Sequence, residues 1–101
     1  DQKMNDGIAA PFFGHTAMSA PALAQFALKF RCPVIPVRVE RLEGPNFCIT
    51  CYPPLEITPS NDKQADILEL TTKVNSILEE WIRERPAQWL WLHNRWPEDL
   101  F

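Results

Sequence analysis

The chain contains 101 residues, enough for one domain, and we expect residues 1–101 to form a segment of a single domain without an internal boundary. Hydrophobic residues account for 46% and charged residues for 23%, which is ordinary for a globular protein and excludes intrinsic disorder. The net charge of −3 is divided unevenly, with +2 on residues 1–42 and −5 on residues 43–101. The basic bias of the first part favours an anionic ligand, but Lys and Arg are too sparse for a nucleic-acid-binding surface.

No apolar run approaches the roughly 20 residues that a membrane-spanning helix needs. The chain starts at Asp1 and has no basic-then-apolar leader of the kind that directs secretion. We expect it to be a piece of a longer protein.

The three cysteines, Cys32, Cys48 and Cys51, are an odd number and give no disulfide framework. Cys48 and Cys51 have the Cys-x-x-Cys spacing of redox and zinc sites. A redox pair of this type lies at a helix start, however, and a four-cysteine zinc site needs a second pair. Residues 47–52 instead have the pattern of a strand, in which positions three apart point to opposite faces. We therefore expect reduced, packed thiols in a reducing compartment, and neither a metal site nor another cofactor.

The first elements along the chain are a loop and a helix. Residues 1–15, with two glycines and a proline, predict a loop. Thr16 or Ser19 is a candidate N-cap for a helix that ends at Arg31, because the residue before Pro33 is disfavoured in a helix. The apolar residues that share one face of this helix are Leu23, Phe26, Ala27 and Phe30.

Two strands are predicted next, over residues 34–42 and 47–52, and the turn between them makes a hairpin. In the first strand Val37 and Val39 share one face, while Arg38 and Glu40 share the other. Pro36 cannot donate to a ladder, so this strand lies at a sheet edge, is bulged, or leaves that backbone position free for a ligand.

The clearest element is a long helix from Asn61 or Asp62 to Arg85. Asn61 and Gln64 have the spacing of a capping box, and Pro86 ends the helix. Residues 86–97 are rich in aromatic side chains and predict a short helix running into a turn. The apolar stripe of the long helix consists of Ile67, Leu70, Val74, Ile77, Leu78, Trp81 and Ile82.

The predicted fold is α/β, in the order helix, strand, strand, long helix and short helical tail. A hairpin alone is marginally stable, so we expect further strands upstream that complete a larger sheet with flanking helices. The four tryptophans, Trp81, Trp89, Trp91 and Trp96, are interpreted as core and docking surface rather than as a ligand cage.

A few ionisable residues are candidates for chemistry. His15 lies in the predicted loop and is interpreted as solvated. Arg41 ends a strand, where functional side chains of α/β sheets often lie, although an ion pair with a neighbouring glutamate is equally compatible. His93 and Glu98 have the His-x4-acid spacing of a general-base dyad, but Pro97 interrupts it. The structural alternative is that His93 and Arg95 fix the tail to the rest of the molecule.

Four blocks of the sequence together resemble the bacterial lipid A biosynthesis acyltransferases, late-acting members of the lysophospholipid acyltransferase superfamily. They are Asp1-Gln2, the Pro11-Phe-Phe-Gly14 block with Thr16 and the Ser19-Ala-Pro21 helix start, Pro33-Val-Ile-Pro-Val37 with Arg41, and Pro86-Ala-Gln-Trp-Leu-Trp-Leu-His-Asn-Arg-Trp96. The resemblance covers essentially the whole chain. It implies the C-terminal part of an acyltransferase-type mixed sheet with flanking helices.

The resemblance implies transfer of a fatty acyl chain from an acyl carrier protein thioester to a hydroxyl of a lipid A precursor. It also implies a catalytic His-x4-Asp/Glu dyad upstream of Asp1-Gln2, so we expect no catalytic residue here and an inactive fragment. The substrate-binding residues that it suggests are Phe12, Phe13, Gly14, Thr16 and Arg41. Arg41 would pair with a phosphate or carboxylate of the substrate.

The same resemblance places the full-length protein at the cytoplasmic face of the bacterial inner membrane, with membrane contact through an N-terminal part missing here. Transfer to a different membrane lipid is an alternative within the superfamily. The alternative from another functional class is a non-enzymatic docking module, in which the Trp-rich tail and the amphipathic helix bind a partner protein. Nucleic acid is not an expected partner.

Overall fold

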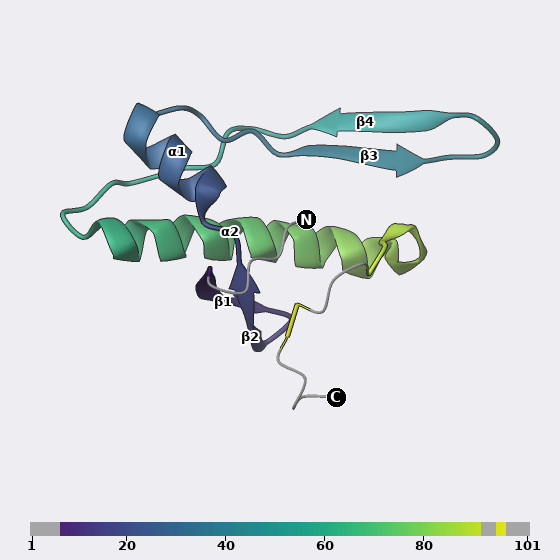
Figure 1. The fold of residues 1–101 in the computed structure, drawn as a ribbon. Coiled ribbons are helices and arrows are strands. Elements are labelled where there is room, and N and C mark those ends of the chain that lie inside the picture. Colours follow the sequence, from purple (N-terminus) through teal and green to yellow (C-terminus); the bar gives the residue numbers. More distant parts are fainter. Residues whose placement is uncertain (1–6, 92–94, 97–101) are drawn as a thin grey trace.

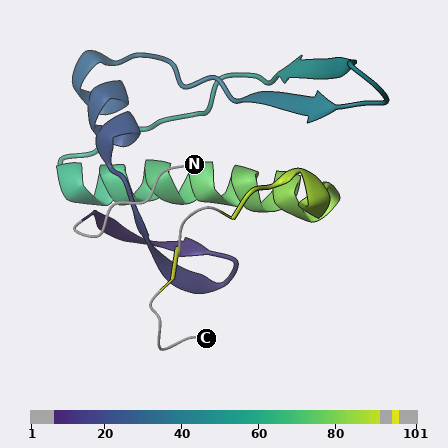
Figure 2. The same ribbon diagram turned by 45° about the vertical axis from the view of Figure 1, so that its right-hand side comes forward.

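Two hairpins lie on opposite sides of one long helix in the computed structural model, which describes residues 7–91 and 95–96 (Figures 1 and 2). The predicted order helix, strand, strand, long helix and short helical tail is confirmed, preceded by a further hairpin. The strands form two separate two-stranded antiparallel sheets, β1–β2 and β3–β4. The elements are β1 (Ile8–Phe12), β2 (His15–Ser19), α1 (Ala22–Phe30), β3 (Val37–Arg41), β4 (Phe47–Cys51), α2 (Lys63–Glu84) and the 3-10 helix η1 (Pro86–Gln88).

The β1–β2 hairpin occupies much of the segment that the sequence predicts as a loop, and that prediction is wrong. Phe12 pairs with His15, which leaves a two-residue connection. Both connecting residues have positive φ, +52° at Phe13 and +76° at Gly14, as the type I′ turns of tight hairpins require. The usual signal for such a turn is Asn-Gly or Asp-Gly, and Pro11 argues against a strand. Phe13-Gly14 therefore gives little indication of a hairpin.

Helix α1 begins later than the sequence predicts. Thr16 and Ser19 lie in β2 and cap no helix, and the N-cap residue is Pro21, which makes no side-chain capping bond. The helix ends at Arg31 as predicted, because that residue adopts a left-handed conformation and its N–H donates to the carbonyl of Ala27.

The face that α1 buries consists of alanines rather than of the large apolar residues of the predicted stripe. Ala24 and Ala27 pack against Ile67 and Leu70 of α2. Small side chains at this contact let the two helices approach closely. The large residues of the stripe are more than 45% exposed: Leu23, Phe26 and Phe30.

The core has two parts along α2. The first is the contact between α1 and the N-terminal half of α2. The second lies toward its C-terminal end, where Phe12 and Ala17 of the β1–β2 hairpin pack against Ile82. Phe12 is fully buried. The helix α2 therefore joins elements that would not be stable alone, since an isolated hairpin buries too little apolar surface.

The β3–β4 hairpin confirms the predicted alternation and has its polar face directed inward. Arg38 is buried and Glu40 is half-buried, whereas Val37 and Val39 are about half exposed. The sequence predicts which residues share a face of this strand, but not which face meets α2.

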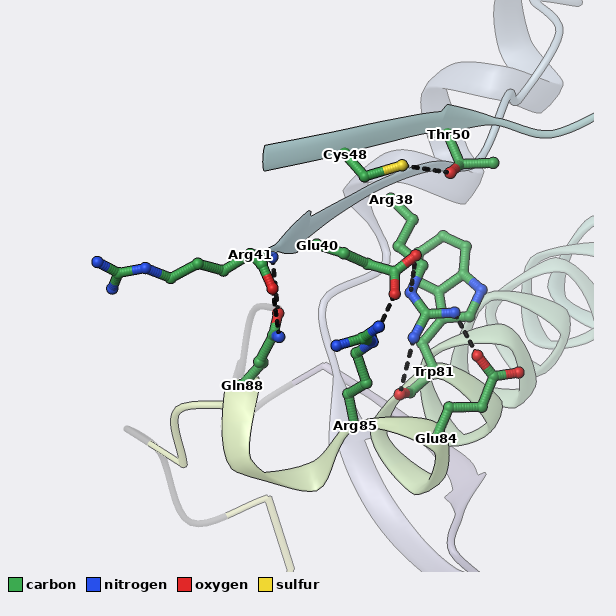
Figure 3. Close-up of polar contacts among 9 residues, drawn as sticks. All are labelled: Arg38, Glu40, Arg41, Cys48, Thr50, Trp81, Glu84, Arg85 and Gln88. Atoms are coloured by element: carbon green, nitrogen blue, oxygen red, sulfur yellow. Dashed lines mark hydrogen bonds and ion pairs between the residues drawn. The ribbon is translucent and has the colours of Figure 1, made fainter. Parts of the chain in front are cut away.

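Arg38 joins this hairpin to the C-terminal end of α2 (Figure 3). Its guanidinium forms an ion pair with Glu84, and a second nitrogen donates to the carbonyl oxygen of Trp81 at 3.4 Å. Glu40 lies between two arginines, with its carboxylate oxygens 3.7 Å from Arg38 Nε and 2.6 Å from Arg85 Nε. The hydrogen bond to Glu84 raises the pKa of Arg38, so this residue stays cationic at any workable pH.

The cysteines are free and exposed. Cys48 pairs across the hairpin with Glu40, and Cys51 pairs with Val37, so the two thiols lie on opposite faces as predicted. The expectation that they are packed is wrong, because Cys32, Cys48 and Cys51 are all exposed.

The N-cap of α2 is Asp62, one of the two predicted starting residues. Its carboxylate accepts a hydrogen bond from the N–H of Ala65 at 3.2 Å. The predicted capping box between Asn61 and Gln64 is not the contact that forms.

We expect Asp62→Ala to destabilise the protein by about 1 kcal/mol, because the first turn of α2 loses an acceptor for its N–H groups. Asn61→Ala is the matched control and should change the free energy of unfolding by less than about 0.5 kcal/mol. Urea denaturation followed by circular dichroism measures both. A larger loss in Asn61→Ala than in Asp62→Ala would assign the cap to Asn61.

We expect Glu84→Gln to destabilise the protein by about 1 kcal/mol, because it removes the main ion-pair partner of a buried guanidinium while Glu84 itself is half exposed. Glu80→Gln on the same helix is the control and should have little effect. A double-mutant cycle of Glu84→Gln with Arg38→Met measures the coupling. Additive effects of the two substitutions would contradict a stabilising ion pair.

Candidate functional site

Two sequence blocks that are far apart in the chain meet at the tip of the β1–β2 hairpin. The ring of Phe12 stacks on that of Trp96, with centroids 5.6 Å apart and planes at 18°. The indole N–H of Trp96 donates to the carbonyl oxygen of Phe12 at 3.0 Å. The ring centroid of Trp91 lies 6.2 Å from the ring centroids of both Phe12 and Phe13. The Phe-Phe-Gly block and the Trp-rich tail thus form one aromatic cluster, favoured by the quadrupoles of its rings.

Polar groups of α2 hold the turn of this hairpin in place. The backbone N–H of Phe13 donates to the carboxylate of Glu79. The guanidinium of Arg83 lies 5.0 Å from the centre of the Phe13 ring, a cation–π contact. The left-handed conformation of Phe13 is therefore stabilised by contacts from the neighbouring helix.

Gly14 and Thr16, two further predicted substrate-binding residues, are exposed on the same hairpin. A Cβ atom on Gly14 would meet no heavy atom within 4 Å, so space does not require glycine there. The positive φ does favour it, since other residues adopt this conformation at a cost. Thr16 precedes the buried Ala17 and points to the outer face of the hairpin.

Arg41, the remaining predicted substrate-binding residue, lies at the end of β3, on the other side of α2 from the β1–β2 hairpin (Figure 1). Its backbone is held by the side-chain amide of Gln88, which accepts from the N–H and donates to the C=O, both at 2.9 Å. The exposed guanidinium extends away from α2 (Figure 3). The structure therefore brings Phe12, Phe13, Gly14 and Thr16 together on one hairpin and places Arg41 elsewhere.

A buried polar cluster that the sequence analysis missed joins β2, α2 and the tail. Ser19 Oγ accepts hydrogen bonds from Asn75 Nδ2 at 3.2 Å and from Arg95 Nη2 at 3.0 Å. The three residues are each at most 3% exposed. The guanidinium of Arg95 also lies 4.8 Å from the Phe12 ring, and burial lowers the pKa of Arg95. Arg95 thus fixes the tail to the body of the protein, as its structural interpretation predicts.

The sequence contains one signal for this cluster. Thr71 and Asn75 are polar and lie four residues apart, so they share a face of α2. Both are buried within a helix whose other buried positions are mostly apolar. Polar residues at buried helix positions need partners, and those of Asn75 are the carbonyl oxygen of Pro11 and the hydroxyl of Ser19 in the distant β1–β2 hairpin.

A cavity of about 440 Å³ opens beside this cluster. Ser19, Thr71, Asn75 and Arg95 supply its polar lining, and apolar side chains supply the rest. Its volume lies within the range of small-molecule sites, and its polar groups could orient a ligand. It is the strongest candidate binding site that the described residues form.

The remaining candidate residues of the sequence analysis are not among the described residues that line this cavity. His15 is exposed at the start of β2. His93 and Glu98, which have the dyad spacing, lie outside the described residues, as do Asp1 and Gln2. Within residues 7–91 and 95–96, no cluster of His, Cys, Asp and Glu has the geometry of a metal site, and no helix is long and apolar enough to cross a membrane.

The tryptophans divide between core and surface. Trp89 and Trp96 pack against the cluster of Phe12, Ala17 and Ile82, and Trp81 lies 5.3 Å from the ring of Tyr52. Trp91 is 47% exposed. Most of the aromatic tail therefore contributes to packing within the protein.

Comparison with known proteins identifies the family. The sequence profile of the bacterial lipid A biosynthesis acyltransferases matches residues 1–98, a range that contains all four blocks of the resemblance. No curated protein matches the chain, and no solved structure does. Because the match extends over nearly the whole length, this chain belongs to the bacterial lipid A biosynthesis acyltransferase family.

Proposed function

We propose that this chain is part of an enzyme that transfers a fatty acyl chain from an acyl carrier protein thioester to a hydroxyl of a lipid A precursor. The observation that carries the proposal is the family match over residues 1–98. The structure adds support, because the Phe-Phe-Gly block and the Trp-rich ending, which are distant in sequence, pack directly on each other.

The general base of this reaction is proposed to lie outside the residues of this chain. Attack of a hydroxyl on a thioester needs a base that removes the hydroxyl proton, and a histidine oriented by a carboxylate is suited to that role. His15, the histidine that the structure describes, is exposed and has no carboxylate contact among the described residues. The chain alone is therefore expected to be inactive.

The side chains of this chain then bind and orient the substrate. Arg41 is the candidate for an anionic group, because its backbone is fixed by Gln88 while its guanidinium is exposed. A guanidinium matches the geometry of phosphate and carboxylate. The β1–β2 hairpin, with Gly14 and Thr16 exposed, is the candidate contact for the acceptor. The enzyme as a whole is proposed to act at the cytoplasmic face of the bacterial inner membrane.

The test of this function is acyl transfer from acyl carrier protein to a lipid A precursor, measured for this chain and for a chain extended upstream. We expect transfer by the extended chain alone. Transfer by the short chain would show that the base lies within it. If a folded extended chain transfers to a different membrane lipid only, the acceptor is reassigned. Failure with every acceptor would contradict the enzyme and favour the partner-docking module.

In the extended chain, we expect Arg41→Gln to raise KM for the acceptor by roughly tenfold with little change in kcat, because a charge-assisted contact to the bound substrate is lost. Arg31→Gln, an exposed arginine at the end of α1, is the matched control and should leave KM unchanged. Steady-state kinetics with varied acceptor concentration separates the two constants. Equal effects of both variants would indicate a general loss of positive charge instead of a specific contact.

A further inference from the structure

Strand β4 leaves one edge of its sheet unpaired. The N–H of Leu42 donates to the carbonyl oxygen of Asn46 at 2.9 Å, which marks this pair as a hydrogen-bonded one. Because such pairs alternate along an antiparallel ladder, every second residue of β4 directs its N–H and C=O away from β3. These residues are Phe47, Ile49 and Cys51. In the part of the chain that the structure describes, no hydrogen bond satisfies their backbone groups.

The other edge of this sheet, along β3, faces the body of the protein. The N–H and C=O of Arg41 are both bonded to the side-chain amide of Gln88. Val39 lines a small cavity of about 80 Å³ with α2 and η1. Figures 1 and 2 show β4 on the far side of β3 from α2. The edge of β4 is therefore the one that a further strand can reach.

The composition of this edge strand favours pairing over exposure to water. Residues 47–52 contain neither a charged residue nor a proline, the two residue types with which proteins commonly protect an exposed edge. Phe47 is 60% and Ile49 is 68% exposed. Pro45 and Pro53 flank the segment and limit the length over which a new strand can pair. An uncharged strand of this kind is a template for another strand.

We propose that two copies of this chain pair along β4, antiparallel and about a two-fold axis at Ile49. In this register Ile49 lies opposite Ile49 of the second copy, and Phe47 lies opposite its Cys51. These are the residues whose N–H and C=O groups are unpaired, so each pair exchanges two hydrogen bonds, about six in all. The facing side chains are uncharged, so the strand is complementary to itself and no like charges meet.

The dimer contains one continuous sheet of four strands, in the order β3, β4, β4, β3. It relieves the marginal stability of an isolated hairpin, and a symmetric contact through one edge of each chain closes the assembly at two copies. The interface is small, since each copy contributes one strand of five residues, so the association should be weak. The proposal goes beyond the transfer reaction, because it needs neither an upstream base nor a substrate.

Sedimentation equilibrium of the 101-residue chain, with its thiols kept reduced, measures the assembly. We expect a monomer–dimer equilibrium with a Kd roughly in the micromolar range and no larger species. A monomer at every concentration up to about 200 μM would overturn the proposal. Open-ended aggregation would overturn it as well, because a single shared edge closes at two copies.

Ile49 and Val39 provide a matched pair of variants. They lie opposite each other in the hairpin, share its outer face and are 68% and 60% exposed. Ile49→Lys brings two like charges together at the two-fold axis and should weaken dimerisation at least about tenfold. Val39→Lys lies one strand away from the edge and should change Kd less than about twofold. Equal weakening by both variants would indicate association through the apolar face and would overturn pairing along the edge.

Disulfide cross-linking tests the register. With the three native cysteines replaced by serine, Ile49→Cys should give a covalent dimer on mild oxidation, because the two copies of this position face each other. A chain that keeps Cys51 as its only cysteine is the control. The two copies of Cys51 would be four positions apart along the strands, about 14 Å, which is too far for a disulfide. Equal cross-linking of both chains would contradict the antiparallel register.

The outcomes for the dimer and for the proposed enzyme are separable. A dimer of the 101-residue chain, without acyl transfer by the extended chain, would support this interface and contradict the proposed enzyme. Acyl transfer by the extended chain, while the 101-residue chain remains monomeric, would do the reverse.

Discussion

The packing of α2 on both of its sides is the constraint on which the rest of the structure depends. Neither two-stranded hairpin can bury enough apolar surface to be stable alone. On one side, Phe12 and Ala17 complete an apolar cluster with Ile82. On the other side the contact is different in kind, because long polar side chains, Arg38 and Gln88 among them, join the β3–β4 hairpin to α2 and η1. Loss of α2 would therefore separate both hairpins.

The sequence predicts the helices and strands that have strong periodicity. It predicts less well which face of each element packs against its neighbours. The alternation of β3 and the stripe of α2 are both present in the structure. Periodicity, however, says only which side chains share a face. It does not reveal that Arg38 turns toward α2 while Val39 is exposed, or that α1 buries alanines. The β1–β2 hairpin escaped prediction because its positive-φ turn begins with Phe13, a residue with no local preference for that conformation.

The candidate site was harder to predict than the fold because its contacts are long-range. Asn75 and Arg95 both donate hydrogen bonds to Ser19, from which they are separated by 56 and 76 residues in the sequence. The family resemblance predicts substrate binding by Phe12, Phe13 and Arg41. The structure places the two phenylalanines in an aromatic cluster and Arg41 on the other side of α2. No local pattern indicates that a serine in β2 accepts hydrogen bonds from a helix and from the tail.

Arg95 connects the two parts of the site physically. Its guanidinium lies over the Phe12 ring and donates to Ser19, so the tail closes the aromatic cluster and the polar cavity with the same side chain. A buried cation is costly unless nearby groups compensate for its lost hydration, and burial here does lower its pKa. The hydrogen bond to Ser19 and the contact with the Phe12 ring offset part of that cost. Arg95 therefore fixes the tail against the β1–β2 hairpin through polar and aromatic contacts at once, which no neighbouring residue in the sequence could reveal.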